Sequence, residues 1–217
     1  MRHCGQTAVQ GEREGGRGDG FPERISAEIS RIVMDEFVLL FLQDSVRNPV
    51  LTPLFTLITT LGNGGMVWIL FSAALLFFPR TRKVGIASLL ALLFSLLINN
   101  IILKNLVGRI RPYETIEGLI PLVARPADYS FPSGHTGSSF AAAWVMYRKL
   151  PRRLGIPALI LAGLIGISRL YVGVHYPTDV LFGAVCGMIS GWIAIRLTEN
   201  FGKKDFCNKD REDGLEE

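Results

Sequence analysis

Long stretches without a charged residue constrain this chain more than any other feature of its sequence. No Asp, Glu, Lys or Arg occurs from Asn48 to Pro79 or from Val84 to Leu103. Three shorter charge-free runs follow, at Thr136–Tyr147, Leu154–Ser168 and Val180–Ile195. An apolar helix of about 20 residues spans a bilayer, and shorter ones span by tilt or local thinning. The pattern therefore predicts a membrane protein; a soluble helical protein with a very apolar core is disfavoured by five such runs in sequence.

The runs predict an all-α fold, a polytopic membrane helix bundle of about six spans. The first run is too long for one span at about 1.5 Å per residue, and Gly62-Asn63-Gly64-Gly65 is a turn signal inside it. We therefore expect two separate helices there, Pro49–Leu61 and Met66–Phe78. The other expected helices are 84–107, 132–147, 156–171 and 177–197. Asn99 and Asn100, as polar residues within a span, should face the bundle interior.

The segments that flank the membrane domain, residues 48–197, differ from it in composition. Residues 1–21 are rich in glycine and charge, which predicts a disordered tail, and they lack the apolar stretch of a signal peptide. Residues 22–45 carry apolar side chains at helical spacing among charges, which predicts an amphipathic helix at the membrane surface. Residues 198–217 form a charged C-terminal tail, also expected to be disordered.

Two short basic loops, at residues 79–83 and 148–153, predict the orientation. Short loops rich in Lys and Arg remain in the cytoplasm, so the loops Gly108–Ser130 and Val172–Tyr176 should lie on the extracytoplasmic side of the cell membrane. With six spans, both termini would then be cytoplasmic. The net charge of +4 is modest, and its placement in these loops does not resemble a nucleic-acid-binding patch.

The stretch Phe131-Pro132-Ser133-Gly134-His135 leads from a loop into a charge-free run. A turn that opens a helix leaves backbone N–H groups free at the helix start, and with the helix dipole they form a site for an anion. His135, in that first turn, can exchange a proton near neutral pH. The motif alone is weak, because many ordinary helices also begin with such a turn.

Cationic residues occur on the side where the orientation rule disfavours them. Lys104 and Arg111 are seven residues apart and share one helix face, and Pro112 follows and ends that helix. Binding an anion is a natural reason for such a placement. For Arg109 we favour a position at the lipid head groups, reached by its long side chain.

A further cation and a His–Asp pair surround the start of the last expected helix. Arg169 ends the preceding helix, His175 follows six residues later, and Asp179 lies one turn beyond His175. Asp179 can therefore accept a hydrogen bond from one ring nitrogen of His175, which makes the other nitrogen a better nucleophile or base. The alternative is a pair that merely caps the helix.

All of these groups are predicted to meet at one face of the membrane. Three cations and free backbone donors suit a phosphate in a displacement reaction, and two histidines can divide nucleophilic attack from protonation of the leaving oxygen. No carboxylate cluster suggests a metal site, so the cations would take the part that Mg²⁺ has elsewhere. No cofactor is expected.

Three stretches resemble the signature of the type-2 phosphatidic acid phosphatase superfamily: Lys104–Pro112, Pro132–His135 and Ser168–Asp179. The resemblance covers about Asn48 to Leu197 and matches in order, spacing and every key residue. It implies a metal-independent membrane phosphatase with a six-helix core. The implied substrates are lipid phosphates and diphosphates, among them phosphatidate, phosphatidylglycerol phosphate and undecaprenyl diphosphate. The short loops look most like those of the bacterial undecaprenyl-diphosphate phosphatases.

The resemblance also implies a role for each site residue. His175 would be the nucleophile that forms a phosphohistidine, Asp179 would orient it, and His135 would be the general acid. The implied phosphate-binding residues are Lys104, Arg111, Ser133, Gly134 and Arg169.

Two other functions remain open on the sequence. One is a non-catalytic lipid-binding or transport protein on the same scaffold, which the intact His135, His175 and Asp179 disfavour. The other is a vanadium haloperoxidase, a soluble enzyme that the charge-free runs disfavour. The expected partners are the bilayer and a lipid phosphate, with no nucleic acid, and the oligomeric state is left open.

Overall fold

The computed structural model describes residues 33–213, with side chains described for residues 33–200. The predicted tail at 1–21, the first part of the predicted helix 22–45 and residues 214–217 lie outside the described residues. Within the described range all regular structure is helical and no strand occurs, in agreement with the predicted fold class.

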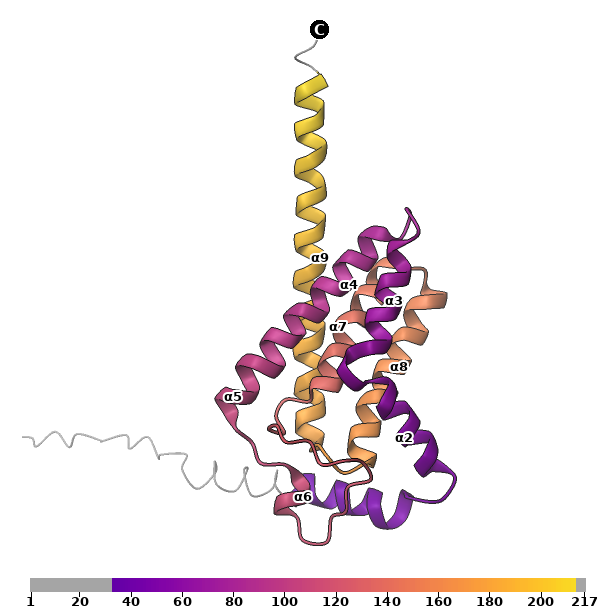
Figure 1. The fold of residues 1–217 in the computed structure, drawn as a ribbon, viewed down its shortest axis with the longest axis vertical. Helices are drawn as coiled ribbons and strands as arrows, with labels where there is room; N and C mark the ends of the chain where they lie inside the picture. The colour runs from indigo at the N-terminus through magenta and orange to yellow at the C-terminus, as the bar shows by residue number, and fades with distance from the viewer. Residues whose placement is uncertain (1–32, 214–217) are drawn as a thin grey trace, which may run out of the picture. The chain divides into compact units, whose positions relative to one another are not determined.

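The helices form a bundle, and the indigo helix that precedes α2 lies across its lower end in Figure 1. Residues 33–41 are helical and continue into η1. The elements that follow are η1 (Leu42–Val46), α2 (Leu51–Leu61), η2 (Asn63–Gly65), α3 (Met66–Leu76), α4 (Arg82–Ser95), η3 (Leu96–Leu103), α5 (Lys104–Val107), α6 (Pro112–Thr115), α7 (Gly134–Lys149), α8 (Arg152–Tyr171) and α9 (Pro177–Asp213). The compact unit that contains the bundle begins at Met34, so the helix that ends at Val46 belongs with the bundle.

The glycine-rich segment Gly62–Gly65 bends the chain instead of reversing it. The expected bounds of the two helices on either side are met closely by α2 and α3, but their axes differ by only 49°, so the pair follows one bent path. Gly64 and Gly65 have φ values of 58° and 68°, in the left-handed region that favours glycine. Both expected helices are present, and the sequence left open whether the first of them spans fully, because a kink and a reversal both need such glycines.

Three helical stretches are long and apolar enough to cross a bilayer: Arg82–Thr115, Arg152–Tyr171 and Pro177–Asn200. The bent α2–α3 pair makes a fourth, whereas α7, with 16 residues, is shorter. Large apolar side chains are exposed along these helices, including Leu54, Leu57, Phe71, Leu93, Ile101, Ile160, Ile167, Phe182, Ile189 and Trp192. An apolar surface this extensive marks contact with a membrane.

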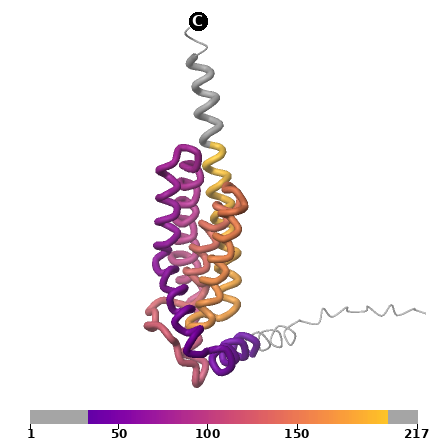
Figure 2. The backbone as a smooth tube through the Cα atoms, turned by 90° about the vertical axis from the view of Figure 1, so that its right-hand side faces the viewer, coloured from indigo at the N-terminus to yellow at the C-terminus, as the bar shows by residue number. Residues whose placement is uncertain are grey.

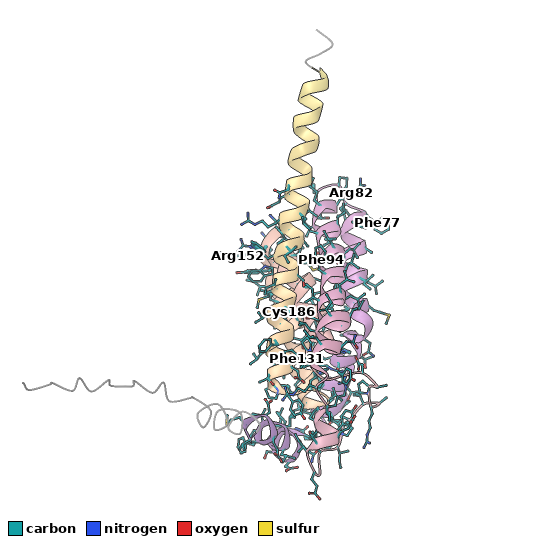
Figure 3. The ribbon with its side chains drawn as sticks, turned by 90° about the vertical axis from the view of Figure 1, so that its left-hand side faces the viewer. Phe77, Arg82, Phe94, Phe131, Arg152 and Cys186 are labelled. Atoms are coloured by element: carbon teal, nitrogen blue, oxygen red, sulfur yellow. The ribbon has the colours of Figure 1, made fainter. Side chains whose placement is uncertain are left out.

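The two ends of the bundle differ in chemistry. Figure 3 labels Arg82 and Arg152 toward one end, which we call the basic end, and Phe131 toward the other, which we call the loop end. The loop between α6 and α7 lies at the loop end together with the helix that ends at Val46, as Figure 2 also shows. Gln43 of that helix donates a hydrogen bond to the carbonyl of Gly118 at 3.0 Å.

The described chain therefore begins at the loop end, while α9 leaves the bundle at the basic end. Six spans would have returned both ends of the chain to the basic end. The difference arises at α2 and α3, which follow one bent path in Figure 1. Helix α9 also continues to Asp213, past Leu197, where the charged tail was expected to begin.

Helices α7 and α9 approach each other to backbone contact. A Cβ atom added at Gly187 would lie 2.3 Å from the carbonyl oxygen of Gly137, and one at Gly191 would lie 2.8 Å from that of Ala141. Small residues permit this kind of packing between helices in membranes. Both helices begin at the loop end, so their first turns lie side by side.

Asn99 and Asn100 in η3 face the interior, as predicted. Asn99 is fully buried, and its amide nitrogen donates to Ser95 at 3.0 Å. A Cβ atom added at Gly137 would lie 2.0 Å from that same nitrogen, and one at Gly134 would lie 2.4 Å from the Asn100 oxygen. Glycines at the start of α7 thus let this helix rest on polar groups of η3.

Candidate active site

The structure brings all of the predicted site residues to the loop end. Two helices end there: α5, which carries Lys104, and α8, which carries Arg169 in its last turn. Two helices begin there: α7, with His135 in its first turn, and α9, with Asp179 in its first turn. Cations near helix C-termini and anion-binding groups at helix N-termini both follow the helix dipoles. The directions of these four helices therefore bring the cations and the anion-binding helix starts together at the loop end.

His175 and Asp179 lie together in the interior. The Nδ1 atom of His175 is 3.5 Å from Oδ2 of Asp179, an ion-pair separation that is long for a hydrogen bond. Their side chains are 2% and 0% exposed. The same Asp179 oxygen accepts from the Tyr176 backbone N–H at 3.0 Å and from the Ser130 hydroxyl at 2.5 Å. The carboxylate is thus fixed from several sides.

The surroundings of His175 favour its neutral form. Burial lowers the pKa of His175 to about 4; Asp179 counters part of this effect, while the charges of Arg169 and Arg111 add to it. Near neutral pH the imidazole is therefore unprotonated and has a lone pair to donate. With Nδ1 facing Asp179, that lone pair is on Nε2.

Lys104 and Arg111 converge on Asp128, a residue that the sequence analysis missed. Lys104 Nζ pairs with Asp128 Oδ2, and Arg111 Nη2 donates to Asp128 Oδ1 at 2.6 Å. Arg111 is also held by two carbonyl oxygens, those of Asp128 at 2.7 Å and Val174 at 2.8 Å. Partial burial would raise the pKa of Asp128, but the bonds and charges of Lys104 and Arg111 outweigh it and lower the pKa to about 2.

Arg169 is almost entirely buried, at 3% exposure. One terminal nitrogen, Nη1, donates to the hydroxyl of Thr59 on α2 at 2.6 Å. Its Nε atom is buried without a hydrogen-bond partner among the described residues. A buried guanidinium N–H without an acceptor has a large affinity for an anion.

The start of α7 is organised by the break between α2 and α3. His135 Nε2 lies 2.9 Å from the Asn63 side-chain oxygen, which orients the imidazole. Ser133 caps α7: its side chain accepts from the Thr136 backbone N–H at 3.5 Å, and its own N–H donates to the Asp179 carbonyl at 3.0 Å. The glycine-rich break thus places a polar group, the exposed side chain of Asn63, beside His135.

Arg109 does not reach outward to head groups, contrary to our expectation. Its guanidinium donates to Asp179 Oδ1 at 2.7 Å and to Asp35 Oδ2 at 2.8 Å. Its side chain is 27% exposed. Two carboxylates attract the guanidinium more strongly than the interface does, and the sequence offered no local signal for either contact.

A cavity of about 430 Å³ opens beside this cluster. Polar residues line one part of it: Asn100, Lys104, Asp128 and His135. Apolar residues of α3, α4 and η3 line the other part: Ile69, Leu89, Leu92, Leu93 and Leu96. A ligand with a charged head and an apolar chain suits such a division. Arg111, Arg169 and His175 are not in its lining and are at most 3% exposed.

The positive charge near this cavity comes from Lys and Arg side chains. Among the described residues, no three His, Cys, Asp or Glu side chains are grouped so that they could hold a metal ion. The groups that could bind a phosphoryl oxygen are the free N–H donors of Lys104, Arg111 and Arg169, with the backbone at the start of α7.

The fold and this site together define a helical membrane bundle that gathers cationic side chains and a His–Asp pair at one end. The chain belongs to the PAP2 superfamily, whose family model matches residues 85–203, more than half of the chain. The resemblance to the type-2 phosphatidic acid phosphatases is therefore confirmed.

Individual relatives agree with this membership. The chain is 33% identical over 131 residues to an undecaprenyl-diphosphatase of Sulfolobus acidocaldarius, covering 60% of this chain and 63% of that protein, just under two thirds of its length. A PAP2-type phosphatidylglycerolphosphate phosphatase from Bacillus subtilis has the same fold, with a TM-score of 0.65, 30% identity, and coverage of 85% of this chain and 93% of that one. Aquifex aeolicus LpxE gives a TM-score of 0.64 and 30% identity, over 76% of this chain and 94% of that one.

Proposed function

We propose that this protein hydrolyses a lipid phosphate or diphosphate through a phosphohistidine intermediate on His175. The observation that carries the proposal is the environment of His175. The His175 imidazole is neutral and lies next to the Asp179 carboxylate, and the charges of Arg111 and Arg169 act on it. A neutral imidazole beside cations can attack an anionic phosphorus whose negative charge those cations stabilise.

In the first chemical step, Nε2 of His175 attacks phosphorus and forms a P–N bond. The bond from phosphorus to the leaving oxygen breaks, and that oxygen takes a proton from His135. Burial and the neighbouring cations lower the pKa of His135 to about 2 in the free protein, so in this proposal the bound phosphate anion offsets those cations and keeps His135 protonated. The positive charge that develops on the His175 ring is stabilised by Asp179 through Nδ1–H. Lys104, Arg111 and Arg169 hold the phosphoryl oxygens, with Ser133 and the Gly134 N–H.

In the second step, a water molecule attacks the phosphohistidine and cleaves the P–N bond. His135, now unprotonated, takes the proton from this water, so phosphate and the original enzyme are restored. The positive charge needed at phosphorus is supplied by side chains in this scheme, so we propose that the reaction is independent of metal ions and cofactors.

The divided cavity supports a substrate with an apolar chain. Its wall of leucine side chains on α4 and η3 continues from the polar part near Lys104 and His135. A prenyl or acyl chain lying there would stay within the bilayer while the head group reaches the cations. Undecaprenyl diphosphate, phosphatidylglycerol phosphate and phosphatidate all have this form.

We further propose that the site faces the extracytoplasmic side of the cell membrane. The basic loops lie at the end of the bundle opposite to the site, marked by Arg82 and Arg152 in Figure 3. Short basic loops remain cytoplasmic. The C-terminal end of α9 would then be cytoplasmic as well, and a C-terminal tag should resist added protease in intact cells.

The proposed function is tested by phosphate release from purified protein. A panel of undecaprenyl diphosphate, phosphatidylglycerol phosphate, phosphatidate and lipid A, each in detergent micelles, should include at least one substrate that is turned over. The same panel with His175→Ala is the control. Lipid binding without phosphate release from any member would indicate a binding or transport protein and would refute the proposal.

A further inference from the structure

Arg109 connects the helix that precedes the membrane domain to the candidate site. Its Nη1 donates to both Asp179 Oδ1 and the Thr178 hydroxyl at 2.7 Å, and its Nη2 donates to Asp35 Oδ2 at 2.8 Å. The guanidinium also stacks on the ring of Tyr176, with 3.7 Å from its central carbon to the ring centroid. Four contacts from three parts of the chain, namely α9, the loop before it and the helix that ends at Val46, fix this guanidinium in one place.

Asp35 is the unexpected member of this group. It belongs to the helical segment that ends at Val46, ahead of the first bundle helix, and its side chain is only 5% exposed. Besides Arg109, it accepts a hydrogen bond from the Thr178 hydroxyl at 2.9 Å. Burying a carboxylate costs free energy unless it is paired, and Asp35 is paired with Arg109. Attaching a surface helix to the bundle does not by itself require a buried charge, so we expect this pair to have a role in the site.

The charges of this group do not cancel. Two buried carboxylates, Asp35 and Asp179, share the single guanidinium of Arg109. Because Asp35 takes part of that positive charge, Arg109 neutralises Asp179 only in part. Asp179 then keeps enough negative charge to stabilise a positive charge on His175.

We propose that Arg109 and Asp35 are positioning residues that fix the orientation and effective charge of Asp179 and, through it, the basicity of His175. The inference rests on the proposed function, in which Asp179 supports the nucleophile. Arg109 occupies Oδ1 of Asp179, which leaves Oδ2 directed to His175. Asp35 offsets the charge of Arg109, and the segment before the membrane domain thereby becomes a part of the catalytic apparatus.

Several other charged or titratable groups face His175 and Asp179, and any pH profile includes their influence. They are Arg111 from the segment before α6, Arg169 from α8, His135 from α7 and Tyr176 from the loop before α9. None of them is altered in the test below, so their contribution is common to all variants.

The test is the pH dependence of kcat/KM, whose acid limb reports the free nucleophile. In Asp35→Asn the full charge of Arg109 acts on Asp179, so the pKa of His175 falls and the acid limb moves to lower pH. In Arg109→Gln the guanidinium is removed, so that pKa rises and the limb moves to higher pH. We expect the acid limb to shift in opposite directions in the two variants, by roughly half a pH unit, because Arg109 and Asp35 act on His175 through Asp179 and not by direct contact.

Glu36→Gln is the matched control, since it removes an exposed carboxylate from the same helical turn and should leave the acid limb unchanged. Arg109→Lys, which keeps the charge, should restore the position of the limb while kcat stays reduced. The double variant Asp35→Asn/Arg109→Gln should match Arg109→Gln alone, because Asp35 acts only through Arg109.

Unshifted acid limbs, or shifts in the same direction, would overturn this inference and assign the group a purely structural role. If Arg109→Gln does not fold, the isosteric Asp35→Asn decides the matter by itself: only a shift to lower pH supports the inference. Failure of the proposed function is a separate outcome, because it would leave the parent protein and Glu36→Gln equally without turnover.

Discussion

Two clusters share the loop end of the bundle, and the protein holds them differently. Around His175 the groups are closed in: Asp179 is fully buried and accepts hydrogen bonds from Arg109, Ser130 and the Tyr176 backbone. Around the cavity the groups are accessible. Asp128 is 54% exposed there, and among the described side chains two cations, Lys104 and Arg111, hold its carboxylate.

The difference separates what is fixed in advance from what can be exchanged. A carboxylate enclosed by donors from several elements cannot move without leaving buried N–H groups unpaired. The Asp128 carboxylate can turn toward water, because its partners Lys104 and Arg111 retain other donors. A phosphate can therefore take its place on these two cations. In the proposed mechanism, the closed cluster supplies the chemistry and the open cluster admits the substrate.

The largest effect should come from the closed cluster. His175→Ala is expected to lower kcat at least about a thousandfold, because no other group can form the covalent intermediate. In the open cluster, His135→Ala should still form an acid-labile phosphoenzyme, particularly from p-nitrophenyl phosphate, whose leaving group needs no proton. Trapping after a quench in alkaline detergent, in which a phosphohistidine survives, measures this, with correct folding checked in both variants. Equal loss of the phosphoenzyme in both would remove the distinction between the two clusters.

The pH dependence gives the next largest effect. Since burial lowers the pKa of His175 to about 4, the folded protein keeps this ring unprotonated down to that pH. At pH 5, kcat/KM should retain about nine tenths of its neutral value as far as this group is concerned. With an unperturbed pKa of about 6.5 it would fall about thirtyfold. An acid limb centred near 6.5 would show that the cluster around His175 is open to water.

A smaller effect is expected at Asp128. Asp128→Asn removes a negative charge next to the phosphate-binding cations, so inorganic phosphate should inhibit about three to ten times more strongly, given the partial solvent exposure. Glu117→Gln, an exposed carboxylate in the same loop, is the control and should leave the inhibition constant unchanged. Weaker inhibition in Asp128→Asn would mean that Asp128 serves mainly to hold Lys104 and Arg111 in position.

The smallest effect should follow from removal of divalent metals. Because Lys104, Arg111 and Arg169 supply the positive charge in the proposed mechanism, activity should persist unchanged in excess EDTA. The control is a metal-dependent phosphatase assayed in the same micelles. Loss of turnover that added Mg²⁺ restores would contradict a site in which cationic side chains suffice.

The sequence predicted those parts of the site that are encoded over short distances. His175 and Asp179 are one helical turn apart, and Lys104 and Arg111 lie in a single motif. Other site residues have partners far away in the sequence. Asn63 contacts His135 across 72 residues, and Thr59 contacts Arg169 across 110. No local pattern marks such residues, since an Asn in a glycine-rich segment indicates only a turn.

The fold was predictable to the same degree. Charge-free runs gave the class, and the helix bounds were close because apolar periodicity and Gly or Pro mark where helices stop. The path between helices was not predictable at Gly62–Gly65, because left-handed glycines are compatible with a kink as well as a reversal. The position of Arg109 was not predictable either, because one of its two carboxylate partners, Asp35, is 74 residues away in the sequence.

The backbone contact between α7 and α9 has a consequence for how this protein could be altered. With Gly187 and Gly191 against carbonyl oxygens of the partner helix, no larger side chain can be introduced without displacing the two helix starts that carry His135 and Asp179. Ile69 on α3 and Leu89 on α4 line the cavity and take no part in this contact between α7 and α9. Preference for the length or branching of the lipid chain can therefore be redesigned along Ile69 and Leu89 as a module, independent of the reaction itself.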